Sequence, residues 1–416
     1  MKRPITLLLA LSLALLTSCE LMAPAPTQRP SIGLPGEPAP TETADPVPSR
    51  MPWQEGVGPD ADRRFSQIGV TICATENSVY FNMLGDQLIR YADKATGICL
   101  PLCGKPECTH NNDNCNAYLY SVSIYGLSCY NDRLYWIDVN PKNWLEECIY
   151  SMAYDGTDRR TERSLGVAGG FLEAQFHRGY LYVSYRTQEV VNAEAKDTLH
   201  VVAYRLGSDE GPVEILNEEV RNLSQQIRIQ AFGDIVYIAL KANEDGSDIE
   251  LYRWDTQIGE LETLFCGDIP FFWRKEFWAT EEGIMLYGNV PTGPEGNPWA
   301  SQEYNIYRFS FESGEIEQVY QFWEGENVNI FASDGVFVGN MLTEAKGNRF
   351  LVKDFAGRTV LDTTFEDIDW YDSPGLMSGI GMDESYLYFT KYSKLFIAVS
   401  RDGSEIRLLW TNDVWS

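Results

Sequence analysis

Histidine residues and linear catalytic motifs are the features that this chain has least of. Its 416 residues include only three histidines, His110, His177 and His200. It contains no Gly-x-Ser-x-Gly elbow, no Walker phosphate loop and no His-Glu metalloprotease motif. No spacing of acidic residues singles out a carboxylate pair for glycoside chemistry. These absences exclude an enzyme built on such a linear motif, but they leave open a site gathered from distant segments.

Basic residues are also scarce. The chain has 33 Lys and Arg against 60 Asp and Glu, a formal net charge of −27. Such a surface repels nucleic acid and anionic polymers. We therefore expect no nucleic-acid partner. A cationic partner, a divalent cation or simply a well-solvated acidic surface all remain open.

The apolar run at the N-terminus is short. Lys2 and Arg3 precede an apolar stretch from Ile5 to Leu16. At about twelve residues, this stretch is too short to span a bilayer as a stable helix and has the form of a secretory signal. We therefore expect residues 1–18 to be a signal peptide.

The end of this stretch, Leu16-Thr17-Ser18-Cys19, resembles the lipobox of bacterial lipoproteins. The resemblance implies cleavage before Cys19 and lipidation of Cys19 at the outer face of the bacterial cytoplasmic membrane. Several acyl chains, each worth about 0.8 kcal/mol per buried CH₂, would give stable attachment. The alternative is an ordinary secretory signal followed by a chance cysteine.

Proline is concentrated just after this point. Ten of the twenty prolines lie between residues 20 and 63. Proline fixes φ and removes a backbone donor, so such a segment does not build strands or helices into a core. Residues 19–63 are therefore predicted to form a disordered Pro-rich tether, and residues 64–416 a single folded domain.

Helical periodicity of useful length is missing from that domain, and a strand pattern repeats instead. A turn with Asp, Asn or Gly leads into an apolar-aromatic strand, and a second strand follows. The equivalent positions are Tyr80, Tyr135, Tyr182, Tyr237, Leu286, Phe337 and Tyr388. Their steps of 55, 47, 55, 49, 51 and 51 residues indicate one four-stranded blade per period of about fifty residues. We predict an all-β, seven-bladed β-propeller, with six or eight blades as alternatives if one repeat is irregular.

Two segments carry a family resemblance. Leu134-Tyr135-Trp136-Ile137-Asp138 resembles the Tyr-Trp-Thr-Asp repeat of low-density-lipoprotein-receptor propellers, with Ile137 where Thr is usual. The segment from Cys103 to Tyr118 is similar to one in surface lipoproteins of clostridial gut bacteria. Together they imply a propeller on a bacterial surface lipoprotein. They imply no particular activity, because propellers serve many functions. Receptor propellers have six blades, whereas seven repeats are present here.

The cysteines include one dense cluster. Cys103, Cys108, His110 and Cys115 offer three thiolates and one imidazole within thirteen residues, a ligand set that suits a tetrahedral structural zinc. The spacing differs from that of a standard zinc knuckle, so one disulfide with a spare thiol, or no bond at all, are alternatives. In each case the cluster would fix a long loop between two blades. Four other cysteines lie in or beside apolar strands and are expected to be buried: Cys73, Cys129, Cys148 and Cys266.

Aromatic residues beside Asp and Arg give the best indication of a ligand surface. Trp273 and Arg274 lie where an inner strand should border the channel, and Trp299 lies in a Pro- and Gly-rich excursion. A further cluster in a loop comprises Trp370, Tyr371 and Asp372. Flat apolar rings with hydrogen-bonding edges suit sugars and peptides. Rings that are packed between blades would instead belong to the core and would not bind a ligand.

These features support two hypotheses of function. The first is a membrane-anchored, extracytoplasmic propeller that binds an extracellular peptide, glycan or protein. The second is an extracytoplasmic enzyme, acting on carbohydrate. A purely structural envelope component is a third, and it would have no well-formed pocket.

Overall fold

The computed structural model describes residues 70–83, 85–121, 124–166, 171–191, 194–220, 226–242, 247–295, 297–322, 327–333, 336–343, 347–364, 378–383, 385–391 and 395–411. These residues belong to one compact unit, Val47–Ser416. The predicted signal peptide, the tether, Cys19 and the cluster of Trp370, Tyr371 and Asp372 lie outside the described residues. Within the described part, no helix has the length and apolar character needed to cross a membrane.

The described residues form seven four-stranded antiparallel sheets. Blade 1 comprises β1 (Val70–Ala74), β2 (Ser78–Met83), β3 (Arg90–Asp93) and β4 (Cys99–Pro101). Blade 2 comprises β5 (Tyr125–Tyr130), β6 (Arg133–Asn140), β7 (Asn143–Ala153) and β8 (Arg160–Ser164). Blade 3 comprises β9 (Phe171–His177), β10 (Tyr180–Val191), β11 (Glu194–Arg205) and β12 (Val213–Glu219). Blade 4 comprises β13 (Ile227–Phe232), β14 (Ile235–Lys241), β15 (Asp248–Asp255) and β16 (Glu260–Asp268).

The remaining three sheets complete the set. Blade 5 comprises β17 (Phe272–Ala279), β18 (Gly283–Pro291), β19 (Gln302–Ser310) and β20 (Ile316–Gln321), with the 3₁₀ turn η1 (Pro298–Ala300) between β18 and β19. Blade 6 comprises β21 (Asn327–Ser333), β22 (Val336–Thr343), β23 (Gly347–Asp354) and β24 (Thr359–Thr364). Blade 7 comprises β25 (Ser378–Met382), β26 (Tyr386–Lys391), β27 (Leu395–Ser400) and β28 (Ile406–Thr411).

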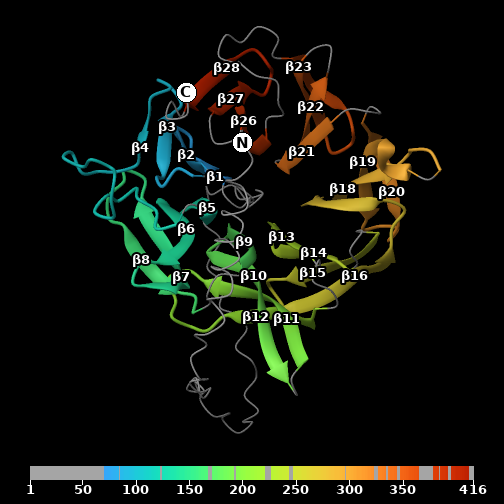
Figure 1. Cartoon of the computed structure of the whole chain (residues 1–416), viewed down its shortest axis with the longest axis horizontal. Coiled ribbons are helices and arrows are strands. Elements are labelled where there is room, and N and C mark those ends of the chain that lie inside the picture. The colour runs from blue at the N-terminus through green and yellow to red at the C-terminus, as the bar shows by residue number, and fades with distance from the viewer. Residues whose placement is uncertain are drawn as a thin grey trace, which may run out of the picture. The chain divides into compact units, whose positions relative to one another are not determined.

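The seven sheets follow one another around a ring (Figure 1). The first strand of each blade contacts the first strand of the next, and β25 of blade 7 contacts β1 of blade 1. The prediction of an all-β, seven-bladed propeller is therefore confirmed. The alternatives of six or eight blades are wrong, because every counted repeat builds one complete sheet.

The repeated sequence pattern corresponds to the second and third strands of each blade. Its equivalent positions lie in the second strands, β2, β6, β10, β14, β18, β22 and β26, and all are 9% exposed or less. These strands are covered on both faces by neighbouring blades, which is why they are almost continuously apolar. Burial of each large apolar side chain contributes about 1.5–3 kcal/mol to the free energy of folding, relative to leaving it exposed.

The outer hairpins share a backbone feature. In all seven blades the turn between the third and fourth strands contains a glycine with positive φ, such as Gly156 at +77° and Gly259 at +71°. Residues with a Cβ are disfavoured in this conformation. In six blades the fourth strand also carries a bulge where it pairs with the third. Bulges increase the local strand twist, which turns the outermost strand away from the innermost one.

Among the described strands, none is exchanged between the first and the last blade where the ring closes. Blade 1 and blade 7 each use four consecutive strands, so their contact depends on packing and side-chain pairs. The rings of Phe81 and Phe396 pack with centroids 4.2 Å apart. Lys94 Nζ lies 2.6 Å from Asp383 Oδ2. Arg407 also donates to the carbonyl of Lys94.

Candidate functional site

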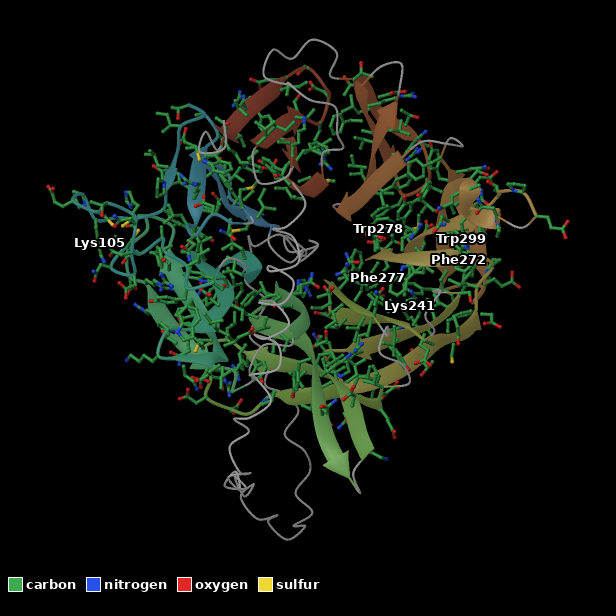
Figure 2. The ribbon with its side chains drawn as sticks, viewed as in Figure 1. Lys105, Lys241, Phe272, Phe277, Trp278 and Trp299 are labelled. Atoms are coloured by element: carbon green, nitrogen blue, oxygen red, sulfur yellow. The ribbon has the colours of Figure 1, made fainter. Side chains whose placement is uncertain are left out.

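The loop between blade 1 and blade 2 carries the strongest candidate site. We call residues 102–121, between β4 and β5, the Cys/His loop; in Figure 2 its Lys105 lies at the outer rim of the ring. The end of the loop returns to blade 1. Ile89 N donates to Ala117 O at 2.9 Å, and Leu119 N donates to Gln87 O at 2.9 Å. These bonds continue the sheet of blade 1 into the loop.

The same loop also docks on the outer hairpin of blade 2. Gly104 N donates to Gly156 O at 3.1 Å, and Asn116 Nδ2 donates to the same carbonyl at 2.8 Å. Arg159 donates to the carbonyl of Asn116 at 3.2 Å. One turn of blade 2 therefore anchors both ends of the Cys-containing segment.

Arg159 is itself held between aromatic rings. Its guanidinium carbon lies 4.7 Å from the ring centroid of Tyr120, 5.4 Å from that of Trp136 and 5.1 Å from that of Tyr150. A partly desolvated cation–π contact is worth about 0.5–2 kcal/mol. The position of the arginine is thus fixed by the core of blade 2.

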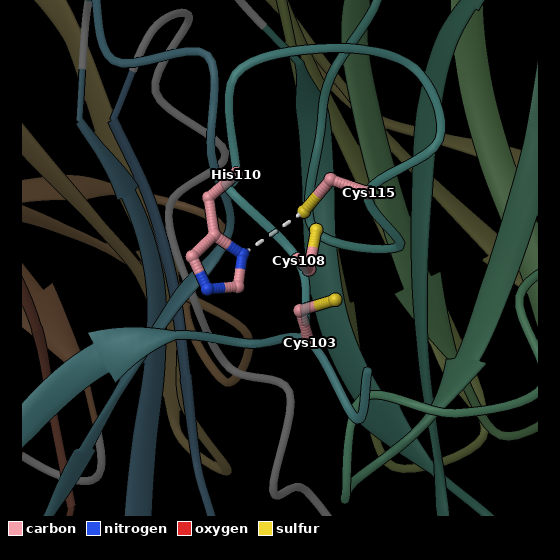
Figure 3. Close-up of side chains that lie close together, drawn as sticks. All are labelled: Cys103, Cys108, His110 and Cys115. Atoms are coloured by element: carbon pink, nitrogen blue, oxygen red, sulfur yellow. Dashed lines mark hydrogen bonds between the residues drawn. The ribbon is translucent and has the colours of Figure 1, made fainter. Parts of the chain in front are cut away.

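The loop brings together all four residues predicted from the spacing. The ligand atoms of Cys103, Cys108, His110 and Cys115 lie within 4.8 Å of one another, and Figure 3 shows the three sulfur atoms and the imidazole facing one another. His110 Nδ1 lies 3.3 Å from Cys115 Sγ. Cys115 is buried, whereas the other three are partly exposed. No disulfide joins these three cysteines in this structure.

Two of these thiols differ in acidity. Burial opposes ionisation of Cys103, but hydrogen bonds from the backbone N–H groups of Lys105 and Asn116 outweigh it and lower the pKa of this thiol. Burial raises the pKa of Cys115 to about 12. Backbone N–H groups aimed at a cysteine sulfur stabilise a thiolate, which is the form that binds a metal.

This donor set fits zinc. Zinc binds sulfur at about 2.3 Å, which places tetrahedral ligands about 3.8 Å apart. The cluster, with all atoms within 4.8 Å, needs only a small contraction to reach that geometry. Four protein ligands would complete the coordination, as in structural rather than catalytic zinc sites.

Trp273 and Arg274 lie in β17, the innermost strand of blade 5. The Trp273 ring is 2% exposed and packs with residues of blades 4 and 5. Its Nε1 donates to Glu276 O at 3.0 Å across a bulge in β17. Arg274 is exposed and donates to Gln302 Oε1 at 2.9 Å. The strand was thus located correctly, and its Trp273 ring belongs to the core.

Trp299 lies on the surface, in η1. It is 46% exposed, and its ring packs against Phe272 with centroids 4.6 Å apart (Figure 2). The excursion between β18 and β19 therefore folds back on the start of β17 and presents one face of an aromatic ring to solvent.

The residues that anchor the Cys/His loop were missed by sequence reasoning. Gly156 follows Gly104 by 52 positions, and Arg159 follows Asn116 by 43. The Asp155-Gly156-Thr157 turn resembles turns in other blades, so nothing in it marks a docking role. Only the folded ring brings the loop and this turn together.

Comparisons with known proteins support the fold alone. No protein-family model matches the chain, and no curated protein matches it. A structure from a study of two prolyl endopeptidases aligns with a TM-score of 0.54 at 10% identity, over 85% of this chain and 51% of that one. An acylaminoacyl peptidase from Pyrococcus horikoshii aligns with a TM-score of 0.48 at 13% identity, over 83% of this chain and 52% of that one.

A third similar structure is a propeller domain by itself. The β-propeller domain of the Trilobed protease from Pyrococcus furiosus aligns with a TM-score of 0.48 at 12% identity, over 84% of this chain and 99% of that one. The chain spans about half the length of the two peptidases.

Proposed function

We propose that this protein is an extracytoplasmic binding module, anchored to the outer face of a bacterial membrane through lipidated Cys19, whose propeller engages a peptide, glycan or protein partner. The observation that carries the proposal is the closed ring of seven blades. Such a ring holds its inter-blade loops on a rigid scaffold, which is how repeat folds present binding surfaces. The lipobox resemblance at Leu16–Cys19 and the Pro-rich stretch that follows support the location.

The surface features favour binding over chemistry. The exposed ring of Trp299 and the docked Cys/His loop are departures from a regular blade. The similarity to peptidases is at 10–13% identity and supports the fold without supporting a reaction. Among the described residues, no observation supports an enzyme that acts on carbohydrate.

We also propose that Cys103, Cys108, His110 and Cys115 hold a structural zinc. The metal would tie the first part of the loop to its last part, while Gly156 and Arg159 hold the loop on blade 2. Zinc bound only by the folded chain adds its binding free energy to stability. The competing arrangement is a disulfide between two of the cysteines, with one thiol left over.

Cobalt substitution distinguishes these two arrangements. Full chain loaded with Co²⁺ should show the intense visible and thiolate charge-transfer bands of a tetrahedral site. We expect Cys108→Ser to weaken those bands strongly, because it removes one of four ligands. Cys99→Ser, just outside the loop, is the matched control and should leave them unchanged. Identical spectra for both variants would contradict the zinc proposal.

The binding function can be tested on the full chain. Wild-type protein should sediment with membranes and incorporate labelled palmitate, and Cys19→Ser should do neither. The protein, purified in a detergent without a sugar headgroup, is then applied to glycan and peptide arrays. Saturable binding to a defined group of probes is expected. If the full chain binds no probe on either array and captures no surface protein, the proposal of a binding module is wrong.

A further inference from the structure

The hairpin between β6 and β7 of blade 2 presents two large apolar side chains to solvent. Trp144 is 64% exposed and Leu145 is 73% exposed. Both belong to a run of five exposed residues, 141–145, which we call the blade 2 tip. Water solvates apolar surface poorly, and adjacent exposed apolar side chains are typical of a surface that something else covers.

The pairing of the two strands explains why these side chains are exposed. Two consecutive residues at the end of β6 pair with Asn143 and with Glu147 of β7. The three residues between these two, which include Trp144 and Leu145, have no counterpart in β6. A bulge of this kind bends the strand and redirects its side chains. The exposure is therefore built into the hairpin.

Hydrogen bonds fix the backbone of the blade 2 tip. Asn143 Oδ1 accepts from Leu145 N at 3.3 Å, and Asn140 Oδ1 accepts from Lys142 N at 3.0 Å. Asn140 Nδ2 also donates to Glu146 Oε2 at 2.5 Å. A tip fixed in this way loses little conformational entropy when it binds.

The blade 2 tip differs in charge from the rest of the chain. Residues 141–145 include one cation, Lys142, and no acidic residue, whereas the whole chain has a formal net charge of −27. The Lys142 ammonium can pair with lipid phosphate while its apolar neighbours enter the hydrocarbon. Tryptophan favours the boundary between water and hydrocarbon. Trp144, Leu145 and Lys142 together therefore match the surface of a lipid bilayer.

The tip lies on the face of the ring at which the chain enters. Val70, the first residue of β1, pairs with Met83, the last residue of β2. Because the blades are repeats around one ring, the connection from second to third strand lies on this same face in every blade. The β6–β7 hairpin is such a connection, and β5 of blade 2 contacts β1 of blade 1. The tip and the chain entry thus share a face and belong to neighbouring blades.

This placement selects the membrane among the surfaces that could cover the tip. In the proposed function Cys19 is lipidated, and it precedes Val70 by 51 positions. A chain of that length spans at most about 180 Å, so the entry face always remains within that distance of the bilayer. Tethering gives the bilayer a high effective concentration at this face, which no untethered protein partner has.

We propose that Trp144 and Leu145 insert into the outer surface of the membrane that holds lipidated Cys19. The inference rests on the proposed lipid anchor and adds the orientation of the propeller. Two side chains alone hold a protein only weakly on a bilayer, but beside an acyl anchor they determine which blades face the lipid. Blade 2 then points toward the membrane. Blade 5, with the exposed Trp299, lies three blades further around the ring and stays open to a partner.

Quenching of tryptophan emission by brominated lipid tests this proposal. Lipidated protein is inserted through its anchor into preformed phosphatidylcholine vesicles, either ordinary or with acyl chains brominated near the headgroup. The emission of Trp144 is the difference between wild type and Trp144→Phe. We expect this emission to shift to shorter wavelength on ordinary vesicles and to lose most of its intensity in brominated lipid.

Two further variants separate insertion from mere proximity. Leu145→Asp places a carboxylate in the blade 2 tip and should restore the lost emission, because a charge is costly to move into hydrocarbon. Ile258→Asp is the matched control, since Ile258 is 64% exposed in the turn between β15 and β16, on the opposite face. It should leave the quenching unchanged. Each variant is compared with its own Trp144→Phe derivative, and thermal unfolding shows that each is folded.

The outcomes distinguish this inference from the proposed lipid anchor. Protein that sediments with vesicles, but whose Trp144 emission is equal in ordinary and brominated lipid, overturns insertion of the tip and leaves the anchored binding module standing. Equal quenching of wild type and Leu145→Asp does the same. Shielding of Trp144 that requires added surface protein assigns the tip to a protein partner and overturns the inference. Protein that does not sediment with vesicles overturns the anchor and the inference together.

Discussion

Gly156 shows how much a single residue contributes to the contact between blades 1 and 2. Its φ is +77°, and a Cβ built on it would lie 2.7 Å from Cys103 N and 2.8 Å from Gly104 N. The Gly156 carbonyl accepts hydrogen bonds from Gly104 and Asn116. The residue therefore serves both the turn of its own hairpin and the Cys/His loop of the neighbouring blade.

We expect Gly156→Ala to be much more harmful than Gly259→Ala. Both residues have positive φ, so each substitution costs about 1–2 kcal/mol of backbone strain. At Gly259 a Cβ meets nothing within 4 Å, whereas at Gly156 it meets the backbone of the Cys/His loop. That clash should add about 1–3 kcal/mol. Urea unfolding of the two variants measures the difference, and equal losses of stability would contradict the docking of the loop.

The sequence predicted the Cys/His cluster but gave no indication of the residues that anchor it. Cys103, Cys108, His110 and Cys115 are close in sequence, so their spacing alone predicted that they could meet. The contacts of Gly156 and Arg159 with the loop depend on the placement of one blade against another, which no local pattern encodes. A pocket lined by Tyr180, Trp254 and Gln257 has the same origin, because its lining comes from strands and turns of blades 3 and 4.

At the scale of the elements, strands differ in how well the sequence marks them. The second and third strands are covered by neighbouring blades, and their apolar runs predicted them. The innermost strands carry buried polar residues such as Gln175 and Gln230, which interrupt the apolar pattern. The outermost strands have an exposed face. Cys266 in β16 is exposed and Cys129 in β5 is partly exposed, so the expectation that both are buried is wrong.

The buried glutamines of the innermost strands have a definite partner. Gln175 Oε1 accepts from Ala231 N at 2.8 Å, and Gln230 Oε1 accepts from Ala279 N at 2.8 Å. Each glutamine thus supplies an acceptor to the first strand of the next blade. Without the glutamine, this backbone N–H at the inner edge of the blade would have no hydrogen-bond acceptor.

We expect Gln230→Leu to destabilise the protein by about 1–3 kcal/mol, because Ala279 N would remain buried without an acceptor. Gln318→Leu, at an exposed position of β20, is the matched control and should change stability by less than about 0.5 kcal/mol. Thermal unfolding compares the two variants. Equal melting temperatures would show that the hydrogen bond between blades 4 and 5 contributes little.

At the scale of the whole molecule, the contact between blades 1 and 7 that closes the ring includes a half-buried ion pair beside the packed rings of Phe81 and Phe396. Lys94 of blade 1 and Asp383 of blade 7 are 17% and 15% exposed at the side chain. Burial opposes ionisation of the Asp383 carboxyl, but hydrogen bonds from Lys94 and Tyr388 outweigh it and lower its pKa. A carboxyl with a lowered folded-state pKa stabilises the fold above its ordinary pKa of about 4, and this contribution is lost as the pH falls below that value.

We expect Lys94→Met to destabilise the protein by about 1–3 kcal/mol at pH 7, between the values for exposed and buried pairs. The difference from wild type should shrink as the pH falls below about 4 and Asp383 is protonated. Lys142→Met, in the exposed turn between β6 and β7, is the control and should show no such dependence. Urea unfolding between pH 3 and pH 7 tests this. A difference that stays constant across the range would contradict the role of Asp383.

The zinc content of the full chain, purified from membranes without added metal, tests the central structural claim most directly. The claim is that a metal held by Cys103, Cys108, His110 and Cys115 ties together the Cys/His loop, which lies between blades 1 and 2. We expect about one zinc per chain, its loss on treatment with a strong chelator, and a lower melting temperature for the metal-free protein. Protein that carries no zinc, and in which two of Cys103, Cys108 and Cys115 are joined by a disulfide, would contradict it.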